Sequence, residues 1–199
     1  MLSLAPDLLA LAAACAPTVA PTTMLAIIQT ESAGDPLAIN VNGSPQVRVT
    51  ATSRSEASRK AGELVAAGRS VDLGLAQINS RNLAWLGLTV EQAFDDCLNL
   101  SAAGRILTDG YQRAGLGQTA PQTALRAALS YYNTGHPSRG LTNGYVDRVL
   151  RAGLAAPPAV ESSVRVEERS QRALPAPWDV FGDFQAARFV NIPEPEVHP

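Results

Sequence analysis

The sequence predicts a mainly helical domain that contains a small β-hairpin and is followed by an irregular C-terminal tail. Apolar residues make up 46% of the 199 residues and aromatic residues only 5%, which favours helices around a sizeable core. Residues 37–52 instead show β-branched alternation around Asn42-Gly43, which predicts the hairpin. From Pro157-Pro158 onward the chain is rich in Pro, Glu, Arg and Val without helical periodicity. We therefore expect one domain over residues 1–155 and a flexible tail over residues 156–199.

The first apolar stretch, from Leu8 to Cys15, is interpreted as a helix that begins near Ser3 or Asp7. It resembles the core of a signal peptide, but Arg48 is the first basic residue, so the positively charged start of such a peptide is missing. Whether an export signal lies upstream of this start or export uses another route stays open. No apolar run is long enough to predict a membrane span.

Pro21 opens the second predicted helix, since proline suits the first turn of a helix. Helical spacing places Glu31 on the same face as Met24 and Ile27, in the last turn of this apolar segment. Residues 33–36 (A-G-D-P) then end the helix, because the glycine can take a left-handed cap and the proline cannot continue the helix. An ionisable group beside an apolar stripe is costly unless it is paired or functional, so Glu31 is a candidate site residue.

The later helices are predicted from their caps and their ends. Ser53 and Glu56 form a capping box for a helix that runs to about Ala67, and Thr89 and Gln92 form a second cap before a short turn. The other expected elements are helices over residues 80–86, 97–114, 121–132 and 142–152, and an irregular or short extended piece over residues 71–79.

The charge and the cysteine and histidine content argue against several classes of function. The formal net charge is -2 and the chain has no basic run, so we expect no nucleic-acid partner. Cys15 and Cys97 form no C-x-x-C motif or Cys/His cluster, so we expect no metal and no cofactor. The two cysteines are either small buried thiols or one long-range disulfide, which would require an oxidising compartment such as the periplasm. His136 and His198 belong to no catalytic pattern, and both are expected to be exposed.

Three short motifs follow one another along the chain. They are Glu31-Ser32, residues 74–79 (G-L-A-Q-I-N) and residues 130–135 (S-Y-Y-N-T-G), the last followed by Tyr145. In this order and spacing they resemble the soluble lytic transglycosylase domain, with Ser130 in the place of the usual alanine. The resemblance covers roughly residues 5–155. It implies a lysozyme-like α+β fold and an enzyme that cleaves the glycan strands of peptidoglycan.

A finer resemblance is to the transglycosylases that accompany type IV secretion systems. It rests on residues 15–19 (C-A-P-T-V), the hairpin residues 38–42 (A-I-N-V-N), residues 77–82 (Q-I-N-S-R-N) and the second cysteine within D-D-C-L-N-L. This resemblance implies a periplasmic enzyme that opens the cell wall locally for a secretion or conjugation apparatus.

The resemblance makes Glu31 the catalytic acid. Cleaving a glycoside requires a proton on the leaving oxygen, and burial beside Met24 and Ile27 would keep a carboxyl group protonated near neutral pH. Hydrolases usually add a second carboxylate. The resemblance instead implies one carboxyl group that acts first as acid and then as base, while the 6-hydroxyl of MurNAc closes a 1,6-anhydro ring. Asp35 and Asp72 are the alternative second carboxylates, although a turn or capping role is favoured for both.

The other motif residues are expected to bind the substrate. Gln77 offers a donor and an acceptor to a sugar, or braces its own loop. Asn79 has a second interpretation as the cap of the following helix, and Tyr132 as a core residue. Ser32 either bonds in the site or finishes its helix. The predicted substrate-binding residues are Ser32, Gln77, Asn79, Tyr132, Asn133 and Tyr145.

Two other functions stay open from the sequence. One is a lysozyme-type peptidoglycan hydrolase that uses Asp72 or Asp35. The other is a non-catalytic wall-binding scaffold, against which the intact motif residues argue.

The expected tail is either disordered with incidental aromatic residues or docks on a secretion-apparatus protein or on the domain itself; its aromatic residues are Trp178, Phe181, Phe184 and Phe189.

Overall fold

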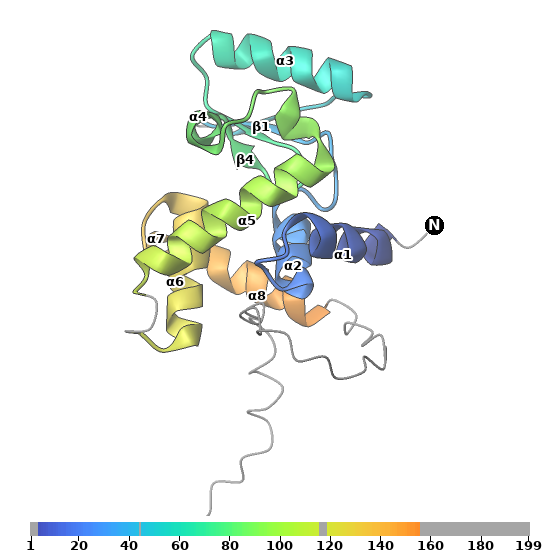
Figure 1. Ribbon diagram of the computed structural model, residues 1–199. Helices are drawn as coiled ribbons and strands as arrows, with labels where there is room; N and C mark the ends of the chain where they lie inside the picture. The colour runs from blue at the N-terminus through green and yellow to red at the C-terminus, as the bar shows by residue number, and fades with distance from the viewer. Residues whose placement is uncertain (1–3, 44, 116–118, 156–199) are drawn as a thin grey trace, which may run out of the picture.

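The computed structural model describes residues 4–43, 45–115 and 119–155 and is mainly helical, as predicted (Figure 1). The expected tail over residues 156–199, with its aromatic residues and His198, and the cap expected at Ser3 lie outside the described residues. The helices are α1 (Leu4–Cys15), α2 (Pro21–Glu31), α3 (Arg54–Ala66), η1 (Ser80–Asn82), α4 (Leu83–Leu86), η2 (Gln92–Phe94), α5 (Asp96–Arg113), α6 (Pro121–Thr134), α7 (Arg139–Thr142) and α8 (Tyr145–Ala155).

Local sequence signals set where several helices begin. Pro21 is the first residue of α2, as predicted. At the start of α3 the Ser53 side chain accepts a hydrogen bond from the Glu56 backbone N–H, as a helix cap does. Before η2 the predicted cap is reciprocal, because the Gln92 backbone N–H donates to the Thr89 hydroxyl and the Thr89 backbone N–H donates to the Gln92 side chain. These helix starts therefore depend on a few neighbouring residues.

The predicted hairpin is present and belongs to a larger antiparallel sheet. Strand β1 (Ile39–Val41) pairs with β2 (Val47–Val49) on one side and with β3 (Val71–Leu73) on the other. Strand β3 also pairs with β4 (Ile78–Asn79), which gives the order β2-β1-β3-β4. Residues 71–79, expected to be irregular or extended, form these two short strands with a turn over residues 74–77 between them.

The last part of the domain also differs from the prediction. The final helix begins at Tyr145 and not at Thr142, because the separate short helix α7 precedes it. Gly144 lies between the two helices with a φ of 75°, a left-handed conformation that breaks the helical path. This break turns the chain so that Tyr145 becomes the first residue of α8.

Helix α5 crosses the middle of the molecule and lies between two groups of elements (Figure 1). The sheet, α3 and α4 lie on one side of α5, and α2, α6 and α8 lie on the other side (Figure 1). Helix α5 packs against α1 and α6, and α2 packs against α8. In the described part of the chain no helix combines the length and the apolar character needed to cross a membrane.

Helix α2 is largely buried. Its side chains from Thr23 to Ile28 are all buried. Met24, Ile27 and Ile28 have no exposed surface at all, and each such side chain contributes roughly 1.5–3 kcal/mol of hydrophobic stabilisation. The packing of α2 therefore fixes the position of Glu31, its last residue.

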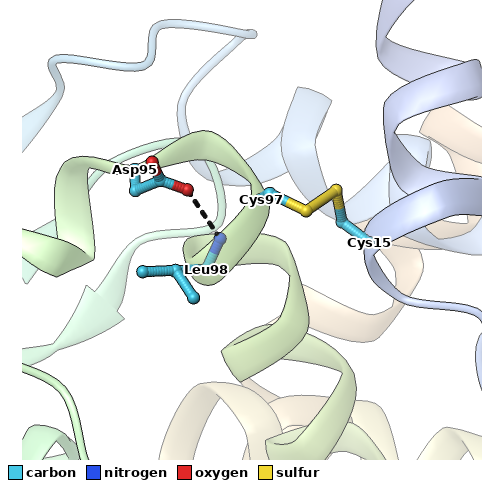
Figure 2. Close-up of a disulfide and its surroundings, with 4 residues drawn as sticks. All are labelled: Cys15, Asp95, Cys97 and Leu98. Atoms are coloured by element: carbon cyan, nitrogen blue, oxygen red, sulfur yellow. Dashed lines mark hydrogen bonds between the residues drawn. A yellow bond between two sulfur atoms is a disulfide. The ribbon is translucent and has the colours of Figure 1, made fainter.

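Cys15 and Cys97 are joined by a disulfide that links the end of α1 to the first turn of α5 (Figure 2). Asp95 caps the same turn of α5, because its side chain accepts a hydrogen bond of 3.1 Å from the Leu98 backbone N–H (Figure 2). Cys97 is exposed, so the alternative of two buried thiols is wrong. The disulfide closes a loop between positions separated by 82 residues.

Candidate active site in the cleft between the two groups of elements

A cleft of about 1310 Å³ is lined by residues from both sides of α5 and from α5 itself. Glu31, the last residue of α2, lines this cleft. The sheet side contributes Asn40, Asn42, Asp72, Gln77, Asn79, Arg81 and Trp85; α5 contributes Ile106, Asp109 and Arg113; the opposite side contributes Glu31, Tyr132, Asn133, Tyr145 and Arg148. Among the predicted substrate-binding residues, only Ser32 does not line the cleft.

Glu31 and Tyr145 form the central contact of the cleft. The Tyr145 hydroxyl donates a hydrogen bond of 2.6 Å to Oε1 of Glu31. The packing of α2 against α8 brings these residues together, although they are 114 positions apart in the chain. The Tyr145 side chain is buried, and burial together with the nearby Glu31 raises the pKa of its hydroxyl well above the ordinary value. Tyr145 therefore remains a hydrogen-bond donor to Glu31 over the whole physiological pH range.

The pKa of Glu31 is raised from 4.5 to about 7. Burial is the largest cause, because it disfavours the charged carboxylate. The hydrogen bond from Tyr145 and the positive charge of Arg148 lower this pKa in part, whereas the negative charge of Asp72 raises it. A carboxyl group with such a pKa is protonated in a substantial fraction of molecules near neutral pH, so it can donate a proton.

Asp72 lies at the centre of β3 and faces the same cleft. Its two carboxylate oxygens accept hydrogen bonds from the side-chain amides of Asn79, at 2.6 Å, and Asn42, at 2.9 Å. Asn79 belongs to β4 and stands opposite Asp72 in the sheet register, and Asn42 directly follows β1, the strand on the other side of β3. Burial raises the pKa of Asp72, and the two amide hydrogen bonds lower it in part. The sheet therefore holds a carboxylate whose charge acts on Glu31.

The second motif forms a tight loop between β3 and β4. Gly74 has a φ of 71°, and a Cβ at this position would lie 2.6 Å from Nδ2 of Asn99. Asn99 of α5 is buried; its side chain donates to the backbone oxygens of Leu73 and Ala93 and accepts from the backbone N–H of Ala76. Only glycine leaves room for this buried amide, which ties the loop to α5.

Gln77 uses most of its hydrogen-bonding capacity within the protein. Its Nε2 donates to the backbone oxygens of Gly74, at 2.9 Å, and Ala38, at 3.2 Å, and its Oε1 accepts from Nδ2 of Asn40 at 2.6 Å. Both N–H groups of the amide are thereby used. Gln77 also has a positive φ of 51°, which its bracing contacts stabilise. Gln77 is a lining residue of the cleft, and its Oε1 accepts the hydrogen bond from Asn40.

Tyr132 connects the third motif to the second. Its hydroxyl donates a hydrogen bond of 2.7 Å to the backbone oxygen of Ala76. Burial, and then the charges of Glu31 and Asp72, raise the pKa of this hydroxyl well above its ordinary value. Tyr132 therefore positions the loop beside Glu31, and the hydrogen bond to Glu31 comes from Tyr145.

Asn133 and Asn143 link the third motif to the start of α8. Nδ2 of Asn143 donates to Oδ1 of Asn133 at 2.9 Å, and Oδ1 of Asn143 accepts from the Tyr145 backbone N–H at 2.9 Å. The Ser130 hydroxyl stabilises the turn between them, because it donates to the His136 backbone oxygen and accepts from the Gly140 backbone N–H. The serine that replaces the usual alanine is therefore a turn-bracing residue.

Ser32, Asn79 and Asp35 have structural contacts close to the site. The buried hydroxyl of Ser32 donates to the Ile28 backbone oxygen and accepts from the Gly34 backbone N–H, so it finishes α2. Asn79 caps η1 by accepting from the Arg81 backbone N–H. Asp35 accepts from the Leu37 backbone N–H and pairs with Arg48. The preference for a turn role of Asp35 is thereby confirmed.

Asn40, Asn143 and Arg148 were not predicted from the sequence as site residues. Asn40 and Asn143 stand in a hairpin and a turn, where asparagine is expected for local reasons, so only their contacts reveal a role. Arg148 follows Tyr145 by three residues, and this helical spacing is the one signal that places it near Glu31. Within the described ranges, no group of three or more His, Cys, Asp or Glu side chains is arranged to hold a metal ion.

Comparison with known proteins finds a matching family and several similar sequences. The transglycosylase SLT domain matches residues 9–148. The protein virB1 of Agrobacterium fabrum (strain C58) is 39% identical over 173 residues, which cover 86% of this chain and 69% of the relative. The type IV secretion system protein virB1 of Brucella suis biovar 1 is 42% identical over 179 residues, which cover 85% of this chain and 74% of the relative. No solved structure matches the chain.

The matched segment spans all three motifs and both partners of the contact between Glu31 and Tyr145. The chain therefore belongs to the transglycosylase SLT domain family and is a peptidoglycan lytic transglycosylase.

Proposed function

We propose that Glu31 is the single catalytic carboxyl group with which this enzyme cleaves the β-1,4 bond between MurNAc and GlcNAc in peptidoglycan. The surroundings of Glu31 carry the proposal: this residue lies in the cleft, receives a hydrogen bond from buried Tyr145, and has a pKa raised to about 7. This pKa allows the same group to donate a proton and later to accept one.

The proposed reaction has two steps. In the first, protonated Glu31 gives its proton to the glycosidic oxygen; the bond from this oxygen to C1 of MurNAc breaks and its electron pair stays on the leaving GlcNAc. In the second, the Glu31 carboxylate accepts the proton of the MurNAc 6-hydroxyl, whose oxygen bonds to C1 and closes the 1,6-anhydro ring. Glu31 is protonated again, and no water is consumed.

The contacts of Asp72 support the one-carboxylate mechanism. A hydrolase would use a second carboxylate as a nucleophile or as the base for water. Asp72 is the candidate that lines the cleft, but both of its oxygens already accept amide hydrogen bonds from the sheet. We assign Asp72 an electrostatic role, in which its charge raises the pKa of Glu31.

The predicted substrate-binding residues are assigned two kinds of role. Asn133 is exposed beside the cleft and Tyr145 contacts the acid, so both are placed to meet the glycan. Gln77 and Tyr132 chiefly hold the loop that carries the second motif, and Asn79 holds Asp72. Ser32 shapes the end of α2.

Digestion of purified peptidoglycan tests the reaction. The wild-type protein should release products with 1,6-anhydro ends, as measured by mass spectrometry, and Glu31→Gln should lower turnover about 10²–10⁴-fold. Asp35→Asn is the control, since Asp35 is outside the cleft. Unchanged turnover in Glu31→Gln would sink the assignment. Products one water heavier would support the hydrolase, and Asp72→Asn would then be the variant that abolishes activity.

The names of the relatives support a place for the enzyme beside a type IV secretion apparatus. We propose that it acts in the periplasm and opens the wall locally for such an apparatus. The aromatic residues of the tail over 156–199 are proposed to dock on a component of the apparatus. Comparing the full chain with a chain that carries Phe181→Ala and Phe184→Ala in a pull-down with the assembled apparatus tests this role; equal retention of both proteins would refute it.

A further inference from the structure

Trp85 is a large aromatic residue that stands exposed at the rim of the catalytic cleft. Its relative exposure is 49%, whereas Leu83 and Leu86 of the same short helix are buried. Trp85 lines the cleft together with Glu31. Trp85 belongs to α4 and Glu31 to α2, and these two helices lie on opposite sides of α5 (Figure 1).

Arg105 of α5 holds Trp85 in place. Its Nη1 donates to the Leu86 backbone oxygen at 2.7 Å, and its Nη2 donates to the Trp85 backbone oxygen at 3.4 Å. Its guanidinium carbon lies 5.5 Å from the centroid of the Trp85 ring, which is within the range of a cation–π contact. One side chain thus contacts both the end of α4 and the indole ring, so Arg105 favours one orientation of the exposed Trp85 ring.

The surroundings of Trp85 suit a sugar ring. The faces of a pyranose carry C–H groups that pack on an aromatic ring, while its hydroxyls need polar partners at the ring edge. Arg81 and Asn82 precede Trp85 and line the same wall, and Asp109 faces the cleft from α5. This part of the cleft thus combines an exposed indole with polar side chains, as carbohydrate-binding subsites do.

We propose that Trp85 is a stacking platform for a sugar of the glycan strand at a distance from the cleaved bond, and that Arg105 positions this platform. The proposal rests on the function proposed for Glu31 and extends it to the length of strand that the cleft binds. A strand that lies on both Glu31 and Trp85 is held at two points, so its binding is stronger than that of a fragment that reaches Glu31 alone.

Tryptophan fluorescence offers a direct test, because the chain has 2 tryptophans, Trp85 and Trp178. A protein with Glu31→Gln and Trp178→Phe keeps Trp85 alone, and a protein with Glu31→Gln and Trp85→Phe keeps Trp178 alone. Titration with soluble, uncross-linked glycan strands should give a saturable change in emission in the first protein and none in the second. No response from Trp85, or an equal response from Trp178, overturns the proposal.

Kinetics on the same strands provide a second test. Trp85→Ala should raise KM about tenfold with kcat changed less than about twofold, and Trp85→Phe should retain most of the wild-type KM because it keeps an aromatic face. Val47→Ala is the matched control, since Val47 is also exposed, at 48%, but does not line the cleft. An unchanged KM in Trp85→Ala, or a loss confined to kcat, overturns the proposal. Turnover of the Glu31→Gln variant on purified peptidoglycan tests the role of Glu31 separately.

Discussion

At the scale of single residues, Tyr145 and Asp72 act in opposite directions on the proton of Glu31. The hydrogen bond from Tyr145 stabilises the carboxylate, and the charge of Asp72 destabilises it. Because the proposed reaction begins with protonated Glu31, kcat/KM should fall as the pH rises through about 7. Tyr145→Phe should raise the pKa of Glu31 and move this fall to higher pH, whereas Asp72→Asn should lower the pKa and move it to lower pH. Profiles of kcat/KM against pH measure both shifts.

Glu63→Gln is the control for these profiles, since it removes an exposed carboxylate of α3 that does not line the cleft. It should leave the fall near its wild-type pH. Tyr145→Phe should also lower kcat by at least about tenfold, because a hydrogen bond to a charged group contributes roughly 1.5–3 kcal/mol. Shifts of the same sign in Tyr145→Phe and Asp72→Asn would contradict the opposing roles.

The sequence predicted these residues to different degrees. Helical spacing alone placed Glu31 at the end of an apolar helix, and the structure has it as the last residue of α2. The partner of its carboxyl group is 114 positions away, so no local pattern indicates it, and Tyr145 entered only through the family resemblance. The amides of Asn40 and Asn143 could not be predicted, because their contacts depend on how the sheet and the turn before α8 fold.

At the scale of elements, the loop between β3 and β4 depends on Gly74. A Cβ there would lie 2.6 Å from Nδ2 of Asn99 and 2.8 Å from the Ala93 oxygen, and the φ of 71° adds strain. Gly74→Ala should therefore lower the free energy of unfolding by about 2–4 kcal/mol. Gly68→Ala is a matched control, since Gly68 has a φ of 76° and no atom within 4 Å of its Cβ; it should cost about 1 kcal/mol. Denaturant unfolding compares the two, and equal losses would contradict the clash.

The elements themselves differ in how far the sequence predicts them. Helices with a proline start or a reciprocal cap were placed correctly, because these signals act within four residues. Strands β3 and β4 are three and two residues long, and their pairing is set by contacts with β1 and α5. Helix α7 has four residues and was missed for the same reason. Tertiary packing, and not propensity, decides such short elements.

At the scale of the whole molecule, the Cys15–Cys97 disulfide joins α1 to α5 across 82 positions. A crosslink over so long a loop restricts the unfolded chain strongly, so Cys15→Ser with Cys97→Ser should lower the free energy of unfolding by about 3–5 kcal/mol. Dithiothreitol should lower the unfolding midpoint of the wild-type protein and leave that of the double variant unchanged. A wild-type midpoint that does not respond to the reductant under unfolding conditions would contradict a stabilising crosslink.

The contact between Glu31 and Tyr145 also makes the protonation of Glu31 depend on the far end of the domain. Glu31 is made early and Tyr145 late, and α2 is covered by α8 only after the chain has reached the end of the domain. Before that, Glu31 is in water, where a carboxyl group keeps a pKa near 4.5 and is ionised at neutral pH. A growing or truncated chain that stops short of α8 therefore contains Glu31 in its ionised form, without the proton that the proposed reaction needs. The raised pKa of Glu31 is thus a property of the complete domain and not of α2 alone.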